Sequence, residues 1–304
     1  MPNYVEDDKA RSDIAATERL LGFPTHGSLE QARLLQWVTE YPQLLQHAWL
    51  VQQVLAQLTA DVLDTGAVEG LRPAFVGLLM HSLNQGAFGA ARDIVLGAMR
   101  AVAEAPTFTE AHESLVFDVG FHTHFVGEEG HAAPRLGHPI ISLGEVQEYF
   151  LAELTPLRRS ILSHGDRSSV TWFAHLLQRL SEASIGPIFI AGNVYDILED
   201  GYADGLLEME SIEALACAIR ATRHDVDGHP TNEQQDGHAD ELAAHLALYV
   251  VALGGQKQLG RIMGNAGFHP ASKMPRRLVM NSGLGEETYR TVARLLGHKS
   301  WAPC

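Results

Sequence analysis

Apolar residues recur at intervals of three and four along most of the chain, the spacing of one face of an α-helix. The alternation of apolar and polar residues that is typical of strands is nearly absent. A capping box, Ser28-Leu-Glu-Gln31, indicates the start of the first helix. We therefore predict an all-α protein with helices over residues 28–41, 43–63, 71–83, 91–102, 109–125, 143–154, 168–198, 209–223, 233–253 and 286–296.

Prolines and glycines divide this helical pattern. Pro106 interrupts the chain after the fourth predicted helix. We interpret residues 1–105 as an N-terminal helical layer packed on a core formed by residues 106–304, the whole being one compact domain. Gly186-Pro187 lies inside the predicted helix 168–198 and indicates a kink there. Residues 127–139 are rich in Gly and Pro and predict a turn.

Composition and charge narrow the classes of partner. The chain has 304 residues, of which 46% are hydrophobic, enough for a sizeable core. It carries 22 Lys and Arg against 37 Asp and Glu, a net charge of −15, which argues against nucleic acid and anionic membranes as partners. The beginning of the chain is polar and acidic, and no apolar run approaches the length of a membrane span. We therefore expect a cytoplasmic protein that acts on small molecules.

The first candidate site is His238-Ala-Asp240-Glu241-Leu-Ala-Ala-His245. At 100° per residue, two histidines seven residues apart lie within about 20° of each other around a helix. Glu241 falls between them and Asp240 lies farther round, so Glu241 is the predicted inward acid. The alternative is a solvated Asp, Glu and His face of a surface helix.

A single acid, Glu182, stands among apolar residues of the predicted helix 168–198, between Leu180 and Ile185. An unpaired carboxylate is costly to bury, and a bound cation would remove that cost. The alternative is a partly exposed glutamate near the kink.

The third cluster lies around the Gly/Pro-rich turn. Glu128 and His138 are ten residues apart, and the glycines and proline between them permit a turn that brings the two together. A rival arrangement places His124, Glu128 and His131 on one helical face at i, i+4 and i+7. Two glycines weaken a continuous helix there and favour His138, but His131 and His124 stay open as alternatives.

These three motifs resemble those of the haem-oxygenase-like diiron oxidases and oxygenases. The resemblance covers roughly residues 110–255 and rests on Glu128-Glu-Gly with His138, on Glu182-Ala-Ser-Ile-Gly-Pro, and on His238 with His245. One position departs from the family pattern, because Leu242 stands where an acid is expected four residues after His238. The acid would then be Glu241 or Asp240.

The resemblance implies a haem-oxygenase-like helical bundle with an N-terminal helical extension, usually a homodimer. It also implies two Fe(II) ions, O2 as co-substrate, and oxidation of a small aliphatic amino acid or related substrate in natural-product biosynthesis. The reaction would be desaturation, C–N ring closure to an azetidine, or C–C cleavage. Arg220 and Arg223 are candidate anchors for a substrate carboxylate. The implied metal ligands are Glu128, His138, Glu182, His238, Glu241 and His245, and the three glutamates are the implied catalytic residues.

Two other functions stay open. The first is a ferritin-like diiron N-oxygenase, in which Glu128-Glu-Gly-His131 would replace the pairing of Glu128 with His138. The second is a non-enzymatic helical binding protein whose histidines lie at the surface. The first predicts that iron binding depends on His131, and the second predicts no stoichiometric metal.

Overall fold

The computed structural model describes residues 68–84, 86–125, 142–223, 233–268 and 284–297. Within these ranges all regular structure is α-helical, in ten helices, which confirms the predicted all-α class. The chain divides into two compact units, residues 1–153 and 154–304, and the boundary falls inside α7 (Leu143–His164).

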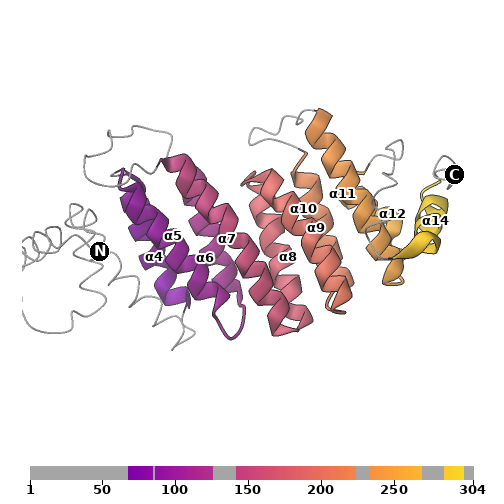
Figure 1. Cartoon of the computed structure of the whole chain (residues 1–304), viewed down its shortest axis with the longest axis horizontal. Helices are drawn as coiled ribbons and strands as arrows, with labels where there is room; N and C mark the ends of the chain where they lie inside the picture. Colours follow the sequence, from indigo (N-terminus) through magenta and orange to yellow (C-terminus); the bar gives the residue numbers. More distant parts are fainter. Residues whose placement is uncertain (1–67, 85, 126–141, 224–232, 269–283, 298–304) are drawn as a thin grey trace, which may run out of the picture. The chain divides into compact units, whose positions relative to one another are not determined.

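The first unit contains α4 (Val68–Asn84), α5 (Phe88–Ala103), α6 (Glu110–Phe125) and the first half of α7. Helices α4, α5 and α6 pack against one another, as Figure 1 shows. Because α6 follows Pro106 and packs back on the two helices before it, that proline lies within the unit. A separate N-terminal layer over residues 1–105 stays a prediction, since most of it lies outside the described residues. Core residues of this unit include Phe75, Leu79, Ile94, Val95, Met99, Leu115 and Val119.

The start of α7 approaches α6 closely at a glycine. A Cβ atom on Gly120 would lie 2.5 Å from Cζ of Phe150, so only glycine fits against this ring. Gln147 Nε2 donates a hydrogen bond to the carbonyl oxygen of Thr123, 3.3 Å away. Helix α7 then continues to His164, beyond the predicted end at residue 154, with Pro156 inside it. Pro156 is exposed, and so is Ala152, whose carbonyl loses its helical hydrogen-bond donor to the proline.

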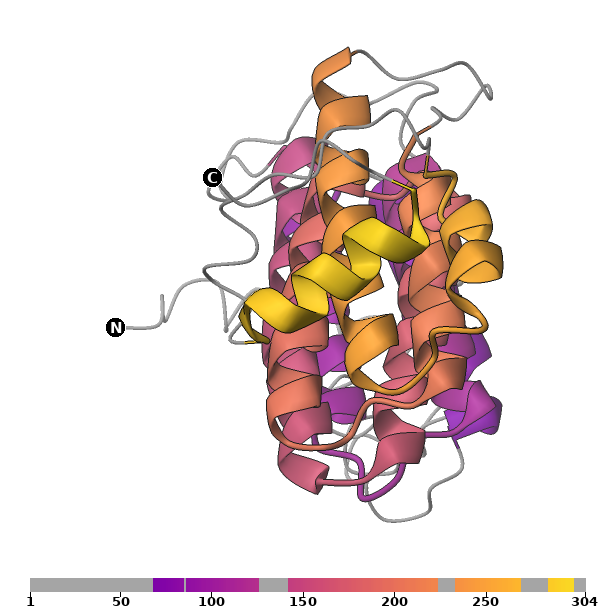
Figure 2. The ribbon, with the colours of Figure 1, turned by 90° about the vertical axis from the view of Figure 1, so that its right-hand side faces the viewer.

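The second unit contains α8 (Arg167–Glu182), α9 (Pro187–Ala203), α10 (Met209–Ala221), α11 (Glu233–Ala252), α12 (Leu259–Asn265) and α14 (Gly285–Leu295). Helix α10 packs on α8, α9, α11 and α12, and α11 also contacts α9, α12 and α14. Figure 2 shows α14 lying across α11. The short α12 is not among the predicted helices, because its glycine-rich sequence weakens the helical pattern.

The predicted single kinked helix over residues 168–198 is wrong, because the structure has two helices, α8 and α9. Between them Ser184 and Gly186 have φ angles of 57° and 55°, in the left-handed region. Two such residues so close together end α8 instead of bending it. Pro187 then begins α9 at a first-turn position, where its missing N–H does no harm.

Candidate functional site

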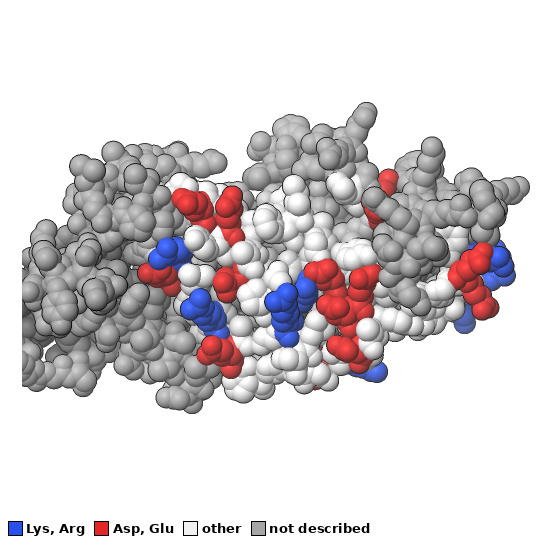
Figure 3. Space-filling model, viewed as in Figure 1, with Lys and Arg blue, Asp and Glu red and all other residues white. Residues whose placement is uncertain are grey.

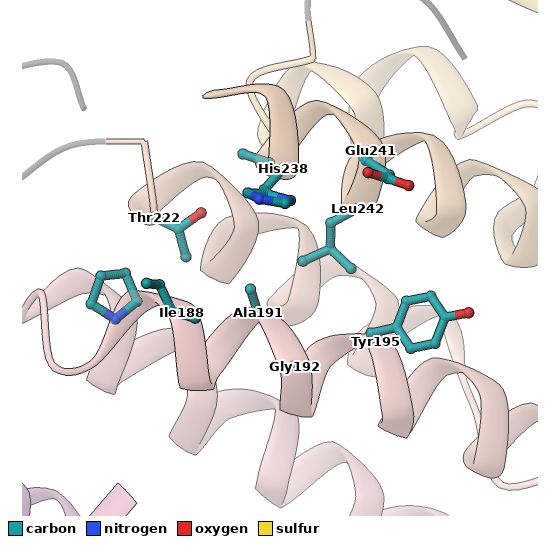
Figure 4. Close-up of a pocket in the computed structure, with 10 residues that line it drawn as sticks. Ile188, Ala191, Gly192, Tyr195, Thr222, His238, Glu241 and Leu242 are labelled. Carbon is teal, nitrogen blue, oxygen red and sulfur yellow. The ribbon is translucent and has the colours of Figure 1, made fainter. Parts of the chain in front are cut away.

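A pocket of about 300 Å³ lies in the second unit between α9 and α11 (Figure 4). This volume is at the lower end of the range for small-molecule sites. Most of the lining is apolar or small, with a few polar groups, the composition typical of such sites. The lining residues are Pro187, Ile188, Ala191, Gly192 and Tyr195 from α9, Thr222 after α10, and His238, Ala239, Glu241 and Leu242 from α11.

The structure brings two of the predicted α11 residues to this pocket. His238 and Glu241 both line it, on either side of Leu242 (Figure 4). His245 follows Glu241 by one helical turn and is fully buried, with none of its surface exposed. Of the three polar residues predicted to share one side of this helix, His238 and Glu241 therefore lie at the pocket and His245 lies in the core.

His245 faces an acidic side chain from α9. Its Nε2 lies 3.8 Å from Oε1 of Glu199. Both ring nitrogens of His245 and this Glu199 oxygen are buried and have no hydrogen-bond partner in the described part of the chain. Buried polar atoms are normally hydrogen-bonded, so these facing atoms without partners call for an explanation. The Glu199 carboxylate as a whole does have a partner, since it is hydrogen-bonded to the Tyr195 side chain.

Two tyrosines enclose the imidazole of His245. The ring of Tyr195 stacks on it, with centroids 4.4 Å apart and planes 12° apart. The ring of Tyr249 meets it edge-on, with centroids 5.0 Å apart. Tyr195 also lines the pocket, so it contacts both the pocket and the imidazole.

Burial sets the protonation of this cluster. It lowers the pKa of His245 to about 4, against the opposing effect of the Glu241 carboxylate. At neutral pH the imidazole is therefore uncharged, and the contact with Glu199 is not an ion pair. Burial, followed by a hydrogen bond to the Glu199 carboxylate, raises the pKa of Tyr195 to about 12. Burial, followed by the charge of Glu199, raises the pKa of Tyr249. A neutral imidazole beside a carboxylate is a combination that binds metal ions.

Asp240 has a different environment from Glu241. Arg223 Nη2 donates to its carboxylate at 2.5 Å, and both side chains are largely buried. Asp240 does not line the pocket, whereas Glu241 does.

Glu182 is not on a buried face. It is the last residue of α8, is exposed, and accepts a hydrogen bond from Gln178 Nε2 at 2.8 Å. The reason is the break after α8, which places Ile185 in the turn and so ends the apolar pattern that flanked Glu182 in the sequence. The position of Glu182 therefore agrees with the alternative interpretation of the sequence, a partly exposed glutamate near the kink.

Of the remaining candidate ligands, His124 alone belongs to the described residues. Glu128, His131 and His138 lie outside the described residues, so their roles stay predictions. His124 lies in the last turn of α6, in the first unit, where its Nδ1 is 2.8 Å from the carbonyl oxygen of Gly120. Within the part of the chain that the structure describes, no three His, Cys, Asp or Glu side chains are grouped so that they could hold a metal ion.

Sequence reasoning missed Tyr195 and Glu199. They stand four residues apart on α9 and so share one helical face, a signal that the sequence carries. Reading 168–198 as one helix placed the end of that helix before Glu199 and hid the signal.

Acidic side chains gather over the C-terminal half of α9, as Figure 3 shows. Asp196, Glu199, Asp200 and Asp204 lie there, and the last turn has no basic residue. The C-terminal end of a helix carries partial negative charge, so these acids add to an unfavourable field. Arg158 donates to Asp196 and offsets part of it. Within the described part of the chain, the half of α9 that carries Glu199 is therefore rich in acids.

Comparisons with known proteins do not assign the chain to a family. No family model matches the chain, and neither a curated protein nor a solved structure matches it. None of the described helices combines the length and apolar character needed to cross a membrane.

Proposed function

We propose that this chain is a non-haem iron oxidase or oxygenase that uses O2 to oxidise a small, mainly aliphatic substrate bound between α9 and α11. The observation that carries the proposal is the pair of the buried His245 and the partly exposed Glu199. Their facing atoms, 3.8 Å apart, have no hydrogen-bond partner among the described residues. Unsatisfied buried polar atoms cost free energy, and a cation bound beside them would give both a partner.

The donor types fit iron. Neutral imidazole and carboxylate are the ligands of non-haem Fe(II) oxygenases, and helical proteins supply them from facing helices. Glu241 lies one turn before His245 on α11 and already lowers the energy of a positive charge there. Because the structure groups no three donors among its described residues, the proposal requires the Glu241 side chain to turn toward the pair.

Iron, when bound, would supply the O2 and one-electron chemistry that amino-acid side chains lack. His245 and Glu199 would hold it, and the stacked ring of Tyr195 fixes the plane of the imidazole. Leu242 and Ile188, which is 73% exposed, would give an aliphatic substrate an apolar surface to pack on. The resemblance to the haem-oxygenase-like diiron family extends the proposal to two irons per chain, a cytoplasmic homodimer and a role in natural-product biosynthesis.

Anaerobic addition of Fe(II) to metal-free protein, followed by desalting and iron analysis, tests this function. We expect bound iron in the wild type and its loss in His245→Ala and Glu199→Gln. The surface pair of His175 and Glu210, 3.7 Å apart, is the matched control, and its His175→Ala variant should retain the iron. Two irons per chain support the diiron form, one supports a single-iron enzyme, and none overturns the proposal. Oxygen uptake stimulated by a small aliphatic substrate then tests catalysis.

A second function is supported by the mainly apolar lining of the pocket. On this view the chain is a helical binding protein for a small apolar molecule, and no metal takes part. It predicts that ligands bind to the pocket while iron does not bind at all.

A further inference from the structure

The rings of four side chains on α9 and α11 form a continuous row. The ring of Tyr195, which lines the pocket, stacks on His245 with centroids 4.4 Å apart. His245 meets the ring of Tyr249 at 5.0 Å, and Tyr249 meets the ring of Tyr202 at 5.2 Å. We call these four side chains the aromatic row. Tyr202 follows Tyr195 by seven residues on α9, so the aromatic row extends roughly 10 Å along that helix, away from the pocket.

The middle of the aromatic row is closed to solvent, whereas its two ends are not. His245 is fully buried and Tyr249 is 1% exposed. Tyr195 is partly exposed at the pocket, and Tyr202 is partly exposed two helical turns farther along α9. Small molecules can therefore approach both ends, while the connection between the ends consists of rings in near contact.

Tyrosine gives up a single electron readily, whereas phenylalanine does not. Phenylalanine would fill nearly the same space without placing a hydroxyl group in the interior, where such a group is costly unless it is hydrogen-bonded. Three of the four rings are nevertheless tyrosines. Rings this close allow an electron to pass between them, because the probability of electron tunnelling falls steeply with distance.

The proton that accompanies an electron from Tyr195 has an acceptor. A tyrosine that loses one electron becomes strongly acidic, so its phenolic proton has to pass to a base within hydrogen-bonding reach. The hydroxyl group of Tyr195 is hydrogen-bonded to the carboxylate of Glu199. Glu199 can therefore take this proton and return it when Tyr195 is reduced again. At the other end of the aromatic row, the partly exposed Tyr202 can release its proton to water.

We propose that the aromatic row carries single electrons from Tyr202 to Tyr195, and so reduces an oxidant left in the pocket when no substrate is present. The electron donor is a one-electron reductant of the ascorbate class, which meets Tyr202 at the surface. The formation of the oxidant from O2 rests on the proposed function. The passage of electrons along the aromatic row does not, because the rings belong to the chain itself.

The electrons and protons of this transfer balance. A one-electron oxidant of the reactive-oxygen class takes an electron from Tyr195, whose O–H bond breaks as the proton passes to Glu199. An electron from Tyr202 then crosses the rings of Tyr249 and His245. It reduces Tyr195, which regains its proton from Glu199, while Tyr202 releases a proton to water. The reductant finally gives Tyr202 one hydrogen atom, which restores its O–H bond.

A photo-oxidant attached beside Tyr202 tests the proposal on the metal-free, full-length protein. Asp204, exposed at the end of α9, becomes the attachment site through Asp204→Cys, and the two native thiols are removed by Cys217→Ala and Cys304→Ser. A ruthenium polypyridyl complex bound to the new thiol is illuminated in the presence of an electron acceptor, and it then oxidises Tyr202. The small trap 2-methyl-2-nitrosopropane adds to tyrosyl radicals, and peptide mass spectrometry identifies the residues that carry it.

We expect the trap on Tyr195 after illumination. Tyr202→Phe removes only a hydroxyl group and should lose most of this label, and Tyr249→Leu, which interrupts the aromatic row, should do the same. Tyr149→Phe is the matched control, because Tyr149 is an exposed tyrosine of the first unit, and it should leave the label on Tyr195 unchanged. The absence of label on Tyr195, or label that persists in Tyr202→Phe, would overturn the proposal.

The iron measurement separates this inference from the proposed function. Label on Tyr195 in a protein that binds no iron supports the inference and overturns the oxidase. Iron binding in a protein whose Tyr195 takes up no label supports the oxidase and overturns the inference.

Discussion

The ring of Tyr195, which lines the pocket, stacks on the fully buried imidazole of His245, with centroids 4.4 Å apart and planes 12° apart. The pocket wall and the His245–Glu199 pair are therefore mechanically linked. A substitution of Tyr195 should therefore change the packing around the imidazole of His245.

The first prediction follows from this stacking. Tyr195→Ala removes the ring and should lower the free energy of unfolding by about 1–2 kcal/mol, since aromatic pairs contribute beyond their buried area. Tyr195→Phe keeps the ring and should stay close to the wild type. Urea denaturation measures both. If the two variants lose equal stability, the hydroxyl group and not the stacking is what matters.

The second prediction concerns acid. The pKa of His245 is lowered to about 4 in the folded protein, below the ordinary value of 6.5. The unfolded chain therefore binds a proton between these values that the folded chain does not, and stability falls as pH falls. This contribution is complete above pH 6.5 and is lost as the pH falls toward 4, a change of roughly 3 kcal/mol.

His245→Gln should flatten this dependence in the metal-free protein. The comparison with the wild type is necessary because burial also lowers the pKa of His112, His122 and His124, which act in the same direction. The measurement is the free energy of unfolding in urea at several pH values from 4 to 7. An unchanged slope in the variant would contradict the burial of a neutral His245.

The third prediction uses a matched pair of glycines in the first unit. A Cβ on Gly120 would lie 2.5 Å from the ring of Phe150, whereas a Cβ on the exposed Gly77 meets nothing within 4 Å. Gly120→Ala should therefore destabilise the protein by about 1–3 kcal/mol through overpacking. Gly77→Ala should stabilise it by up to about 1 kcal/mol through helix propensity. Thermal unfolding measures both, and a neutral Gly120→Ala would show that α6 and α7 approach less closely.

The fourth prediction separates two neighbouring acids on α11. Asp240 is tied to Arg223 at 2.5 Å, so Asp240→Ala should cost about 1–3 kcal/mol of stability and leave iron binding intact. Glu241 lines the pocket, so Glu241→Ala should lose iron with little effect on stability. Iron analysis and urea denaturation on both variants decide between them. The reverse pattern would make Asp240 the ligand, the alternative that the sequence left open.

The bounds of two helices could be predicted from the sequence almost to the residue. Helix α6 was expected over 109–125 and α11 over 233–253, and they span Glu110–Phe125 and Glu233–Ala252. The break between α8 and α9 was not, because it depends on the left-handed conformation of Ser184, a residue type that rarely adopts it. The side of α11 that carries His238, Glu241 and His245 was predicted from spacing alone. Glu199, which faces His245, could not be predicted in this way. It belongs to another helix, and only the packing of α9 on α11 brings the two residues together.

The enclosure of His245 by two tyrosines has one more consequence, which concerns light absorption. Burial and the Glu199 carboxylate raise the pKa values of Tyr195 and Tyr249. Of the seven tyrosines in the chain, these two should therefore form phenolate only at strongly alkaline pH or when α9 and α11 separate. The ultraviolet absorbance of phenolate would then report the opening of this helix interface directly, without any added dye or label.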